Sequence, residues 1–201
     1  MSKKLFLYYP LHPFYVIQGF GLNQSPLYKK MGMLGHNGLD CYRTIFNNPP
    51  ISGSNVRAAH DGEVTYTGID SCEGYGVVVR TLEPFDYNGG ESHFKTIFWH
   101  LEKNIQVKVG QKVKIGDILG TADNTGCSTG AHLHFGLKPI AQGENDWTWT
   151  NSEQTNGYFG AIDPAPYFVG ISAYEFISKL ETIRRQIDSL WKTLQALMGK
   201  R

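Results

Sequence analysis

The chain has 201 residues, and its 19 Lys and Arg residues nearly balance its 18 Asp and Glu residues, for a net charge of +1. This balance excludes the strong electrostatic attraction that draws basic proteins to nucleic acid or to acidic membranes. Hydrophobic residues make up 41% of the chain, enough for the core of one domain with an appendage, and no run approaches the ~20 apolar residues of a membrane span.

The N-terminal segment does not have the pattern of a secretory signal peptide. Lys3 and Lys4 resemble its basic start, but the apolar run 5–9 stops at Pro10. That run is shorter than the roughly 7–15 residues of a signal-peptide core. We expect a role outside the cell to require another route of export, and the sequence leaves the localisation unknown.

Short runs of apolar and β-branched residues, bounded by Gly, Asn or Asp, recur through the first 170 residues. They predict strands in residues 14–17, 63–66, 76–80, 95–100, 117–120 and 132–135, with no helix of useful length before residue 173. In residues 107–120, regularly placed glycines predict a β-hairpin. Residues 1–170 are therefore expected to form a mainly β domain.

Residues 141–160 form a polar loop that carries four aromatic side chains: Trp147, Trp149, Tyr158 and Phe159. A loop of this length is usually functional or disordered. The aromatic residues either form one wall of a binding groove or cover the core, and the sequence leaves both interpretations open.

Residues 173–198 contain neither Gly nor Pro, which predicts a domain boundary near Gly170. Large apolar residues there alternate steps of four and three, as in a helix with a narrow apolar seam: Phe176, Leu180, Ile183, Ile187, Leu190, Leu194 and Leu197. The flanking positions offer no complementary charge pairs that would specify a two-stranded coil. Residues 171–201 are thus expected to be an amphipathic helix that docks on the β domain or forms a homo-oligomer, and the long seam favours the oligomer.

His132 and His134 stand two positions apart in an apolar strand. Because side chains alternate along a strand, both imidazoles face one side and Leu133 faces the other. A lone histidine there is usually structural, whereas two on one face are costly to bury unless their nitrogens are used. The pair leaves a structural and a functional role about equally open.

A second motif, GHNGLD at residues 35–40, contributes His36 and Asp40 on either side of Gly38. Alone, this spacing is common by chance. Together with one histidine of the later pair, it supplies the imidazole and carboxylate ligands that zinc accepts, and it leaves the fourth position of a catalytic zinc site open. The remaining histidine would then be available for proton transfer.

These motifs follow one another as GHNGLD, FWHL at 98–101, VKVGQKVKIGDILG at 107–120 and TGCSTGAHLHF at 125–135. With IQGFG at 17–21 and IDPAPYF at 162–168, the series resembles the lysostaphin-type zinc peptidoglycan endopeptidases over roughly residues 10–168. The resemblance implies an antiparallel β-sheet or sandwich-like fold with a substrate groove. It also implies one zinc ion per chain and hydrolysis of peptide bonds in bacterial cell-wall peptidoglycan, in the stem peptide or the cross-bridge.

The resemblance also assigns roles to particular residues of this sequence. It implies three zinc ligands, His36, Asp40 and His134, and two catalytic histidines, His100 and His132. The catalytic pair would orient the attacking water and transfer its proton. By itself, His100 would be interpreted as a core or capping residue, so its role depends on the resemblance.

Two further assignments follow from the resemblance alone. Tyr28 would stabilise the oxyanion of the reaction, although a surface role is the more common one for such a tyrosine. Cys72 and Cys127 would pair as a disulfide in an oxidising compartment, with two reduced thiols as the alternative. Cys41, next to a ligand on a strand, is expected to point away from the metal.

Some modules of the same family are not enzymes but bind cell walls or regulate other proteins, and they lack the histidines or the aspartate. This chain keeps all five positions, which favours an enzyme. It departs from the family pattern at Leu22 and Asn23, and at Gly136, where we expect an effect on groove shape only. The remaining histidines are expected to be ordinary loop or surface residues: His12, His60 and His93.

Overall fold

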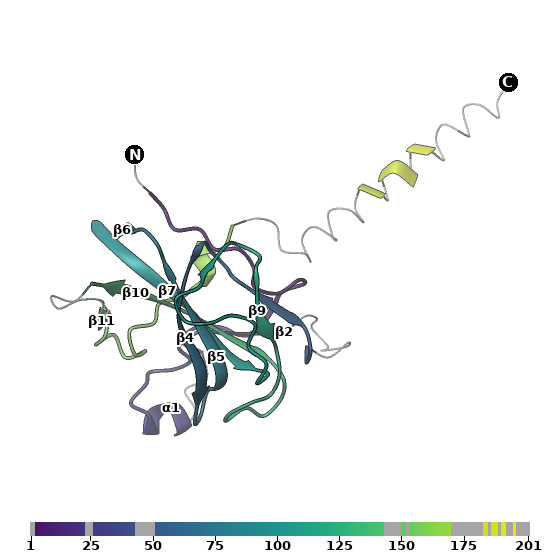
Figure 1. Cartoon of the computed structure of the whole chain (residues 1–201). Helices are drawn as coiled ribbons and strands as arrows, with labels where there is room; N and C mark the ends of the chain where they lie inside the picture. Colours follow the sequence, from purple (N-terminus) through teal and green to yellow (C-terminus); the bar gives the residue numbers. More distant parts are fainter. Residues whose placement is uncertain are drawn as a thin grey trace. The chain divides into compact units, whose positions relative to one another are not determined.

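A computed structural model of the chain describes residues 3–22, 26–42, 51–142, 150–151 and 153–169, and further on residues 183, 184, 186–188, 190, 191 and 195. The chain divides into two compact units, Met1–Val169 and Gly170–Arg201. The first unit contains the named strands and helices (Figure 1).

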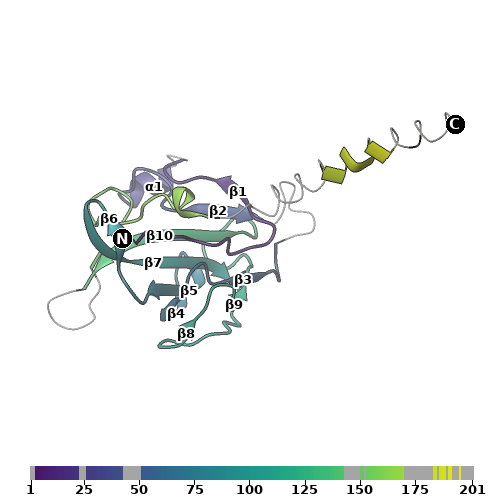
Figure 2. The same ribbon diagram turned by 90° about the horizontal axis from the view of Figure 1, so that it is seen from above.

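A nine-stranded sheet dominates the first unit. Its order is β1-β2-β10-β7-β5-β4-β8, with β11 beside β10 and β6 beside β7, and a separate sheet pairs β3 with β9 (Figure 2). All these strand pairs are antiparallel. The strands are β1 Tyr15–Gln18, β2 Leu39–Tyr42, β3 Asn55–Arg57, β4 Gly62–Asp70, β5 Gly74–Thr81, β6 Phe85–Tyr87, β7 Gly90–Leu101, β8 Lys112–Val113, β9 Ile118–Thr121, β10 Leu133–Ala141 and β11 Thr150–Asn151. Two short helical segments accompany them, α1 Pro26–Lys30 and the 3-10 turn η1 Ala165–Tyr167.

The central strands bury one face in the hydrophobic core and turn the other toward the functional groups. In β10, Leu133, Phe135 and Leu137 belong to the core cluster. Strand alternation therefore places His134 and Lys138 on the opposite face. The prediction of a mainly β, antiparallel fold is confirmed.

The predicted hairpin in residues 107–120 is wrong. Strand β8 pairs with β4, and β9 pairs with β3 in the other sheet, so the two arms diverge. Tight turns at Gly110 and Gly116, whose φ angles are 84° and 87°, reverse the chain twice in this stretch. Local turn signals predict where a chain reverses, but they do not specify which strand each arm will pair with.

The described residues of the second unit are helical, which agrees with the predicted helix as far as they extend. Ile183, Ile187, Leu190 and Trp191 of its apolar stripe are exposed. Four predicted seam residues lie outside the described part: Phe176, Leu180, Leu194 and Leu197. Among the described residues, no helix is long and apolar enough to cross a membrane.

Candidate metal centre

The candidate ligands lie on the first strands of the main sheet and on the turn before β2. His134 of β10 pairs directly with Asp40 of β2. Leu39 and Cys41 lie in the core, so alternation turns Asp40 to the other face, where His134 also lies. His36 reaches the same place from the turn that leads into β2.

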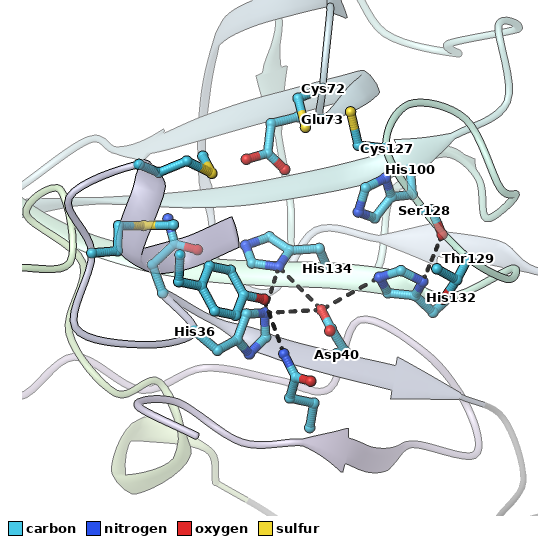
Figure 3. A pocket seen from close by; sticks show the side chains of 15 residues that line it. His36, Asp40, Cys72, Glu73, His100, Cys127, Ser128, Thr129, His132 and His134 are labelled. Atoms are coloured by element: carbon cyan, nitrogen blue, oxygen red, sulfur yellow. Dashed lines mark hydrogen bonds and ion pairs between the residues drawn. The ribbon is translucent and has the colours of Figure 1, made fainter. Parts of the chain in front are cut away.

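The three side chains converge on one point (Figure 3). The Nε2 atom of His36 and the Nδ1 atom of His134 are each 3.1 Å from the Oδ1 atom of Asp40, and the two nitrogens are 3.0 Å apart. Ligand atoms of a tetrahedral zinc site, each about 2.0–2.2 Å from the metal, lie roughly 3.3 Å apart. The observed triangle is close to that size.

Hydrogen bonding alone cannot satisfy this triangle. Burial opposes the ionisation of Asp40, but its contacts with His132, His134 and His36 together outweigh burial and hold the pKa of Asp40 well below its usual range. An ionised carboxylate only accepts hydrogen bonds, and each ring nitrogen either donates or accepts. One of the three contacts therefore always joins two donors or two acceptors, whereas a cation at the centre satisfies all three atoms. The donor set fits a metal ion.

The surroundings of the triangle hold the two imidazoles in place. The Nδ1 atom of His36 lies 3.2 Å from the carbonyl oxygen of Gly19, to which it donates, so Nε2 keeps a lone pair for a metal. A Cβ at Gly38 would lie 2.8 Å from the Cε1 and Nε2 atoms of His134 and 2.6 Å from the oxygen of Phe135. Glycine at position 38 thus makes room for the ring of His134.

His132 and His100 lie beside the triangle. The ring centroids of these two residues are 4.5 Å apart, and Nε2 of His132 is 3.5 Å from Oδ1 of Asp40. The backbone φ of His100 is 63°, a left-handed conformation that residues other than glycine seldom adopt. Such strained positions concentrate at functional sites.

Backbone carbonyls fix the orientation of both rings. Nδ1–H of His100 donates to the oxygen of Thr125 at 2.7 Å, and Nδ1–H of His132 donates to the oxygen of Gly130 at 2.8 Å. Nε2 of each neutral ring is then a proton acceptor. The pKa values of the two rings differ: burial and the neighbouring His132 lower the pKa of His100 to about 4. Burial also opposes the charge on His132, but Asp40, the carbonyl of Gly130 and Glu73 together outweigh burial and raise the pKa of His132.

The five histidine and aspartate residues line a pocket of about 190 Å³ that also contains Tyr28, Glu73 and Cys72. The hydroxyl of Tyr28 accepts a hydrogen bond of 3.1 Å from Nε2 of Gln18, and the ring centroids of Tyr28 and His36 are 6.1 Å apart. Burial raises the pKa of Tyr28, so its hydroxyl remains protonated at neutral pH. Tyr28 lines the pocket with the other candidates, while its catalytic role stays a prediction.

The cysteines take different positions. Cys41 lies in the core with its Sγ atom toward the oxygen of Leu39, away from the pocket, as expected. Cys72 and Cys127 are thiols on the pocket wall, where a hydrogen bond that the Cys72 thiol donates to Cys127 raises the pKa of Cys72 to about 11. Their disulfide stays a prediction.

The loop 141–160 contributes aromatic side chains in two ways. Tyr158 packs on Phe20 with ring centroids 4.6 Å apart, and Phe159 lines a second pocket next to His134. The described part of the loop therefore both covers the core cluster, which Phe20 joins, and borders a groove. Trp147 and Trp149 lie outside the described residues.

Sequence reasoning missed two features around the site. The carbonyls that orient His100 and His132 come from the loop that precedes β10, and no side-chain motif marks a backbone acceptor. His60, expected to be a loop or surface residue, is buried instead, with Nε2 3.0 Å from Oγ1 of Thr96. A histidine whose two nitrogens bond to neighbours inside the core leaves no local signal in the sequence.

Comparison with known proteins agrees with this arrangement. Residues 35–146 match the model of Peptidase family M23, and the chain belongs to that family. The recognition of a lysostaphin-type family is thereby confirmed. The matched stretch includes all five histidine and aspartate residues of the site.

Several relatives can be named. The chain is 30% identical over 158 residues to the glycyl-glycine endopeptidase ALE-1 of Staphylococcus capitis, a match that covers 70% of this chain and 38% of that protein. It is 31% identical over 134 residues to the peptidoglycan DD-endopeptidase ShyC of Vibrio cholerae, covering 66% of this chain and 27% of that protein. The crystal structure of a zinc-containing peptidase from Vibrio cholerae has a TM-score of 0.53 and 29% identity, covering 68% of this chain and 37% of that chain. The chain thus spans well under half the length of these relatives.

Proposed function

We propose that the protein is a zinc-dependent endopeptidase that hydrolyses peptide bonds of bacterial peptidoglycan. His36, Asp40 and His134 would hold one zinc ion per chain, and His100 and His132 would act as proton-transfer groups. The observation that carries the proposal is the triangle of donor atoms, 3.0–3.1 Å on each side, next to two oriented histidines. Membership of a peptidase family and the names of the relatives support the substrate class.

The chemistry divides between the metal and the chain. A bound zinc ion would activate water near neutral pH and polarise the scissile carbonyl. His132, whose Nε2 atom faces Asp40, would take the proton of the attacking water and return it to the leaving amine. His100, neutral because its pKa is about 4, would accept a hydrogen bond and orient the water.

Tyr28 would assist from the other side of the pocket. Its protonated hydroxyl would donate a hydrogen bond to the oxyanion that forms on the former carbonyl oxygen. The hydroxyl accepts a hydrogen bond of 3.1 Å from Nε2 of Gln18, which holds it at the wall of the pocket.

The alternative is a non-catalytic module that binds or regulates the cell wall with the same fold. Such a module has no need for two oriented proton acceptors beside a metal-binding triangle. The presence of both His100 and His132 within 4.5 Å of each other therefore favours the enzyme.

Digestion of purified cell walls tests the proposal. The zinc-loaded full chain would be incubated with two kinds of wall. One kind has a glycine cross-bridge, and the other has a direct cross-link between stem peptides. New termini would be identified by mass spectrometry. We expect new amino and carboxyl termini at one type of bond, lost after chelation and restored by zinc. Binding to walls without any new termini would contradict the enzyme and support the alternative.

A further inference from the structure

Three basic residues form a row across the sheet, away from the metal centre. Arg80 of β5 pairs directly with Lys95 of β7, and Lys95 pairs directly with Lys138 of β10. The row lies four positions along β10 from His134, on the same face. At about 3.3 Å per residue, that separation is roughly 13 Å.

The row and the metal centre border the same hollow. A pocket of about 520 Å³ is lined by all three basic residues and by His134 and Trp99. Figure 2 shows the three strands that carry the row, β5, β7 and β10, side by side in the sheet. An extended peptide of about four residues would span from His134 to the row.

One position of the floor between the two ends has no side chain. Gly136 stands between His134 and Lys138, and a Cβ there would lie 3.4 Å from the Cβ of Ile97 and 3.8 Å from the backbone oxygen of Asn37. A Cβ at Gly76 would lie 1.9 Å from Cε3 of Trp99, which shows that the indole ring lies directly against Gly76. The missing side chain at Gly136 thus leaves room along β10, whereas the indole ring of Trp99 fills the space over Gly76.

The charges of the row are not balanced within the described chain. Like charges directly opposite one another destabilise a sheet. Arg80 has a partner, Glu63, at 3.1 Å. Among the described residues, neither Lys95 nor Lys138 forms an ion pair. Burial lowers the pKa of Lys95, and burial together with Lys95 lowers the pKa of Lys138 to about 8.

The acidic groups of the same hollow lie elsewhere. Oδ1 of Asp70 accepts hydrogen bonds from the backbone nitrogens of Cys72 and Glu73, at 2.8 and 3.0 Å, and so closes the turn between β4 and β5. Glu73 lines both pockets, including the one that contains the metal triangle. Glu73 raises the pKa of Lys138 from a distance but forms no ion pair with it, so the hollow keeps unbalanced positive charge at the end far from the metal centre.

We propose that Lys95 and Lys138, next to Arg80, bind a carboxylate of the substrate peptide about four residues from the scissile bond. This inference rests on the proposed function and narrows its substrate class. A glycine bridge carries no side-chain carboxylate, whereas peptidoglycan stem peptides do. The row would therefore select peptides that contain an acidic residue of the stem.

The test compares two forms of the same peptides, one with free and one with amidated carboxyl groups. Cross-linked stem-peptide dimers would be released from purified walls, and one half of the preparation would be amidated with carbodiimide and ammonium. Binding of both forms to the zinc-loaded full chain with His100→Ala, whose turnover should be about 10²–10⁴-fold slower than that of the parent, would be measured by calorimetry. We expect the carboxylate form to bind about 10- to 100-fold more tightly, the range for a hydrogen bond to a charged group.

Substitutions of the lysines test whether the row causes the preference for the carboxylate form. Lys95→Gln and Lys138→Gln should each remove most of this preference, Lys95→Arg should retain it, and the exposed Lys103→Gln should leave it unchanged. Equal binding of the two forms to the parent, or an unchanged preference in both Gln variants, would overturn the inference. Zinc-dependent cleavage of both forms at equal rates would also overturn the inference, but it would leave the proposed function intact. Absence of zinc-dependent cleavage of any wall peptide would instead contradict the proposed function.

Discussion

The Nε2 atom of His36 lies 3.0 Å from the Nδ1 atom of His134, although 98 positions separate the two residues in the chain. Gly38 makes this contact achievable, because any side chain at that position would meet the His134 ring at 2.8 Å. The glycine of the GHNGLD motif is therefore a space requirement of the metal centre.

Replacement of that glycine tests this relationship. Gly38→Ala should displace the His134 ring and weaken zinc binding by about 10- to 100-fold, as changes around metal ligands typically do. Gly90→Ala, where a Cβ would meet nothing closer than 3.9 Å, is the matched control. Zinc affinities from competition with a chelating dye would measure both. Equal affinity in the two variants would show that position 38 does not constrain the site.

Metal binding and proton transfer should be separable by substitution. His132→Ala and His100→Ala should each retain one zinc ion, because neither side chain belongs to the triangle. Their turnover should fall by about 10²–10⁴-fold, the usual contribution of a general acid–base group. Zinc content and initial rates on wall peptides would be measured together. If His132→Ala loses zinc while His134→Ala retains it, the roles of the pair are reversed.

The basic row has a predicted effect on stability that depends on pH. The pKa of Lys138 falls from 10.5 to about 8 on folding, so the unfolded chain binds more protons between those values. The charge of Lys138 thus destabilises the fold below pH 8, and this effect disappears as the pH rises toward 10.5. Lys138→Met should be more stable than the parent at pH 7 by at most about 3 kcal/mol, and the gain should shrink by pH 10.

Urea unfolding of the parent and the variant at both pH values measures this effect. Lys103→Met, at an exposed lysine, should show no such change between the two conditions. A gain for Lys138→Met that is the same at pH 7 and pH 10 would mean that its charge is not the cause.

The C-terminal unit provides a fourth prediction. We propose that its apolar stripe mediates self-association, because the sequence places large apolar residues in one long seam, and monomers rarely tolerate such a patch uncovered. A chain ending at Gly170 should keep its zinc and its activity on soluble peptide but should lose any oligomer. Sedimentation of both forms at micromolar concentration measures this. A monomeric full-length chain would contradict the proposal.

The sequence predicted which side chains gather at the candidate site better than it predicted their surroundings. Two short motifs predicted His36, Asp40 and the histidine pair, because strand alternation and ligand chemistry are both local. The pairing of His134 with Asp40 on neighbouring strands depends on the whole sheet, and it could be inferred only through the resemblance to a family.

Other features depend on long-range register and had no local signal. The sequence of residues 107–120 signals the turns, but it does not signal which strands β8 and β9 pair with. The hairpin prediction was wrong for this reason. In the sequence, nothing distinguishes Arg80, Lys95 or Lys138 from an ordinary solvent-exposed residue of a strand. Only the register of β5, β7 and β10 shows that they form one row.

Zinc content tests the central claim most directly. Native mass spectrometry of the full chain should show one zinc ion in the parent and in His12→Ala, a control at an exposed histidine outside the pocket. It should show none in His36→Ala or in Asp40→Ala, since each substitution removes one of three ligands. Retention of parent-level zinc in both of these variants would contradict the assignment of His36, Asp40 and His134 as the metal centre.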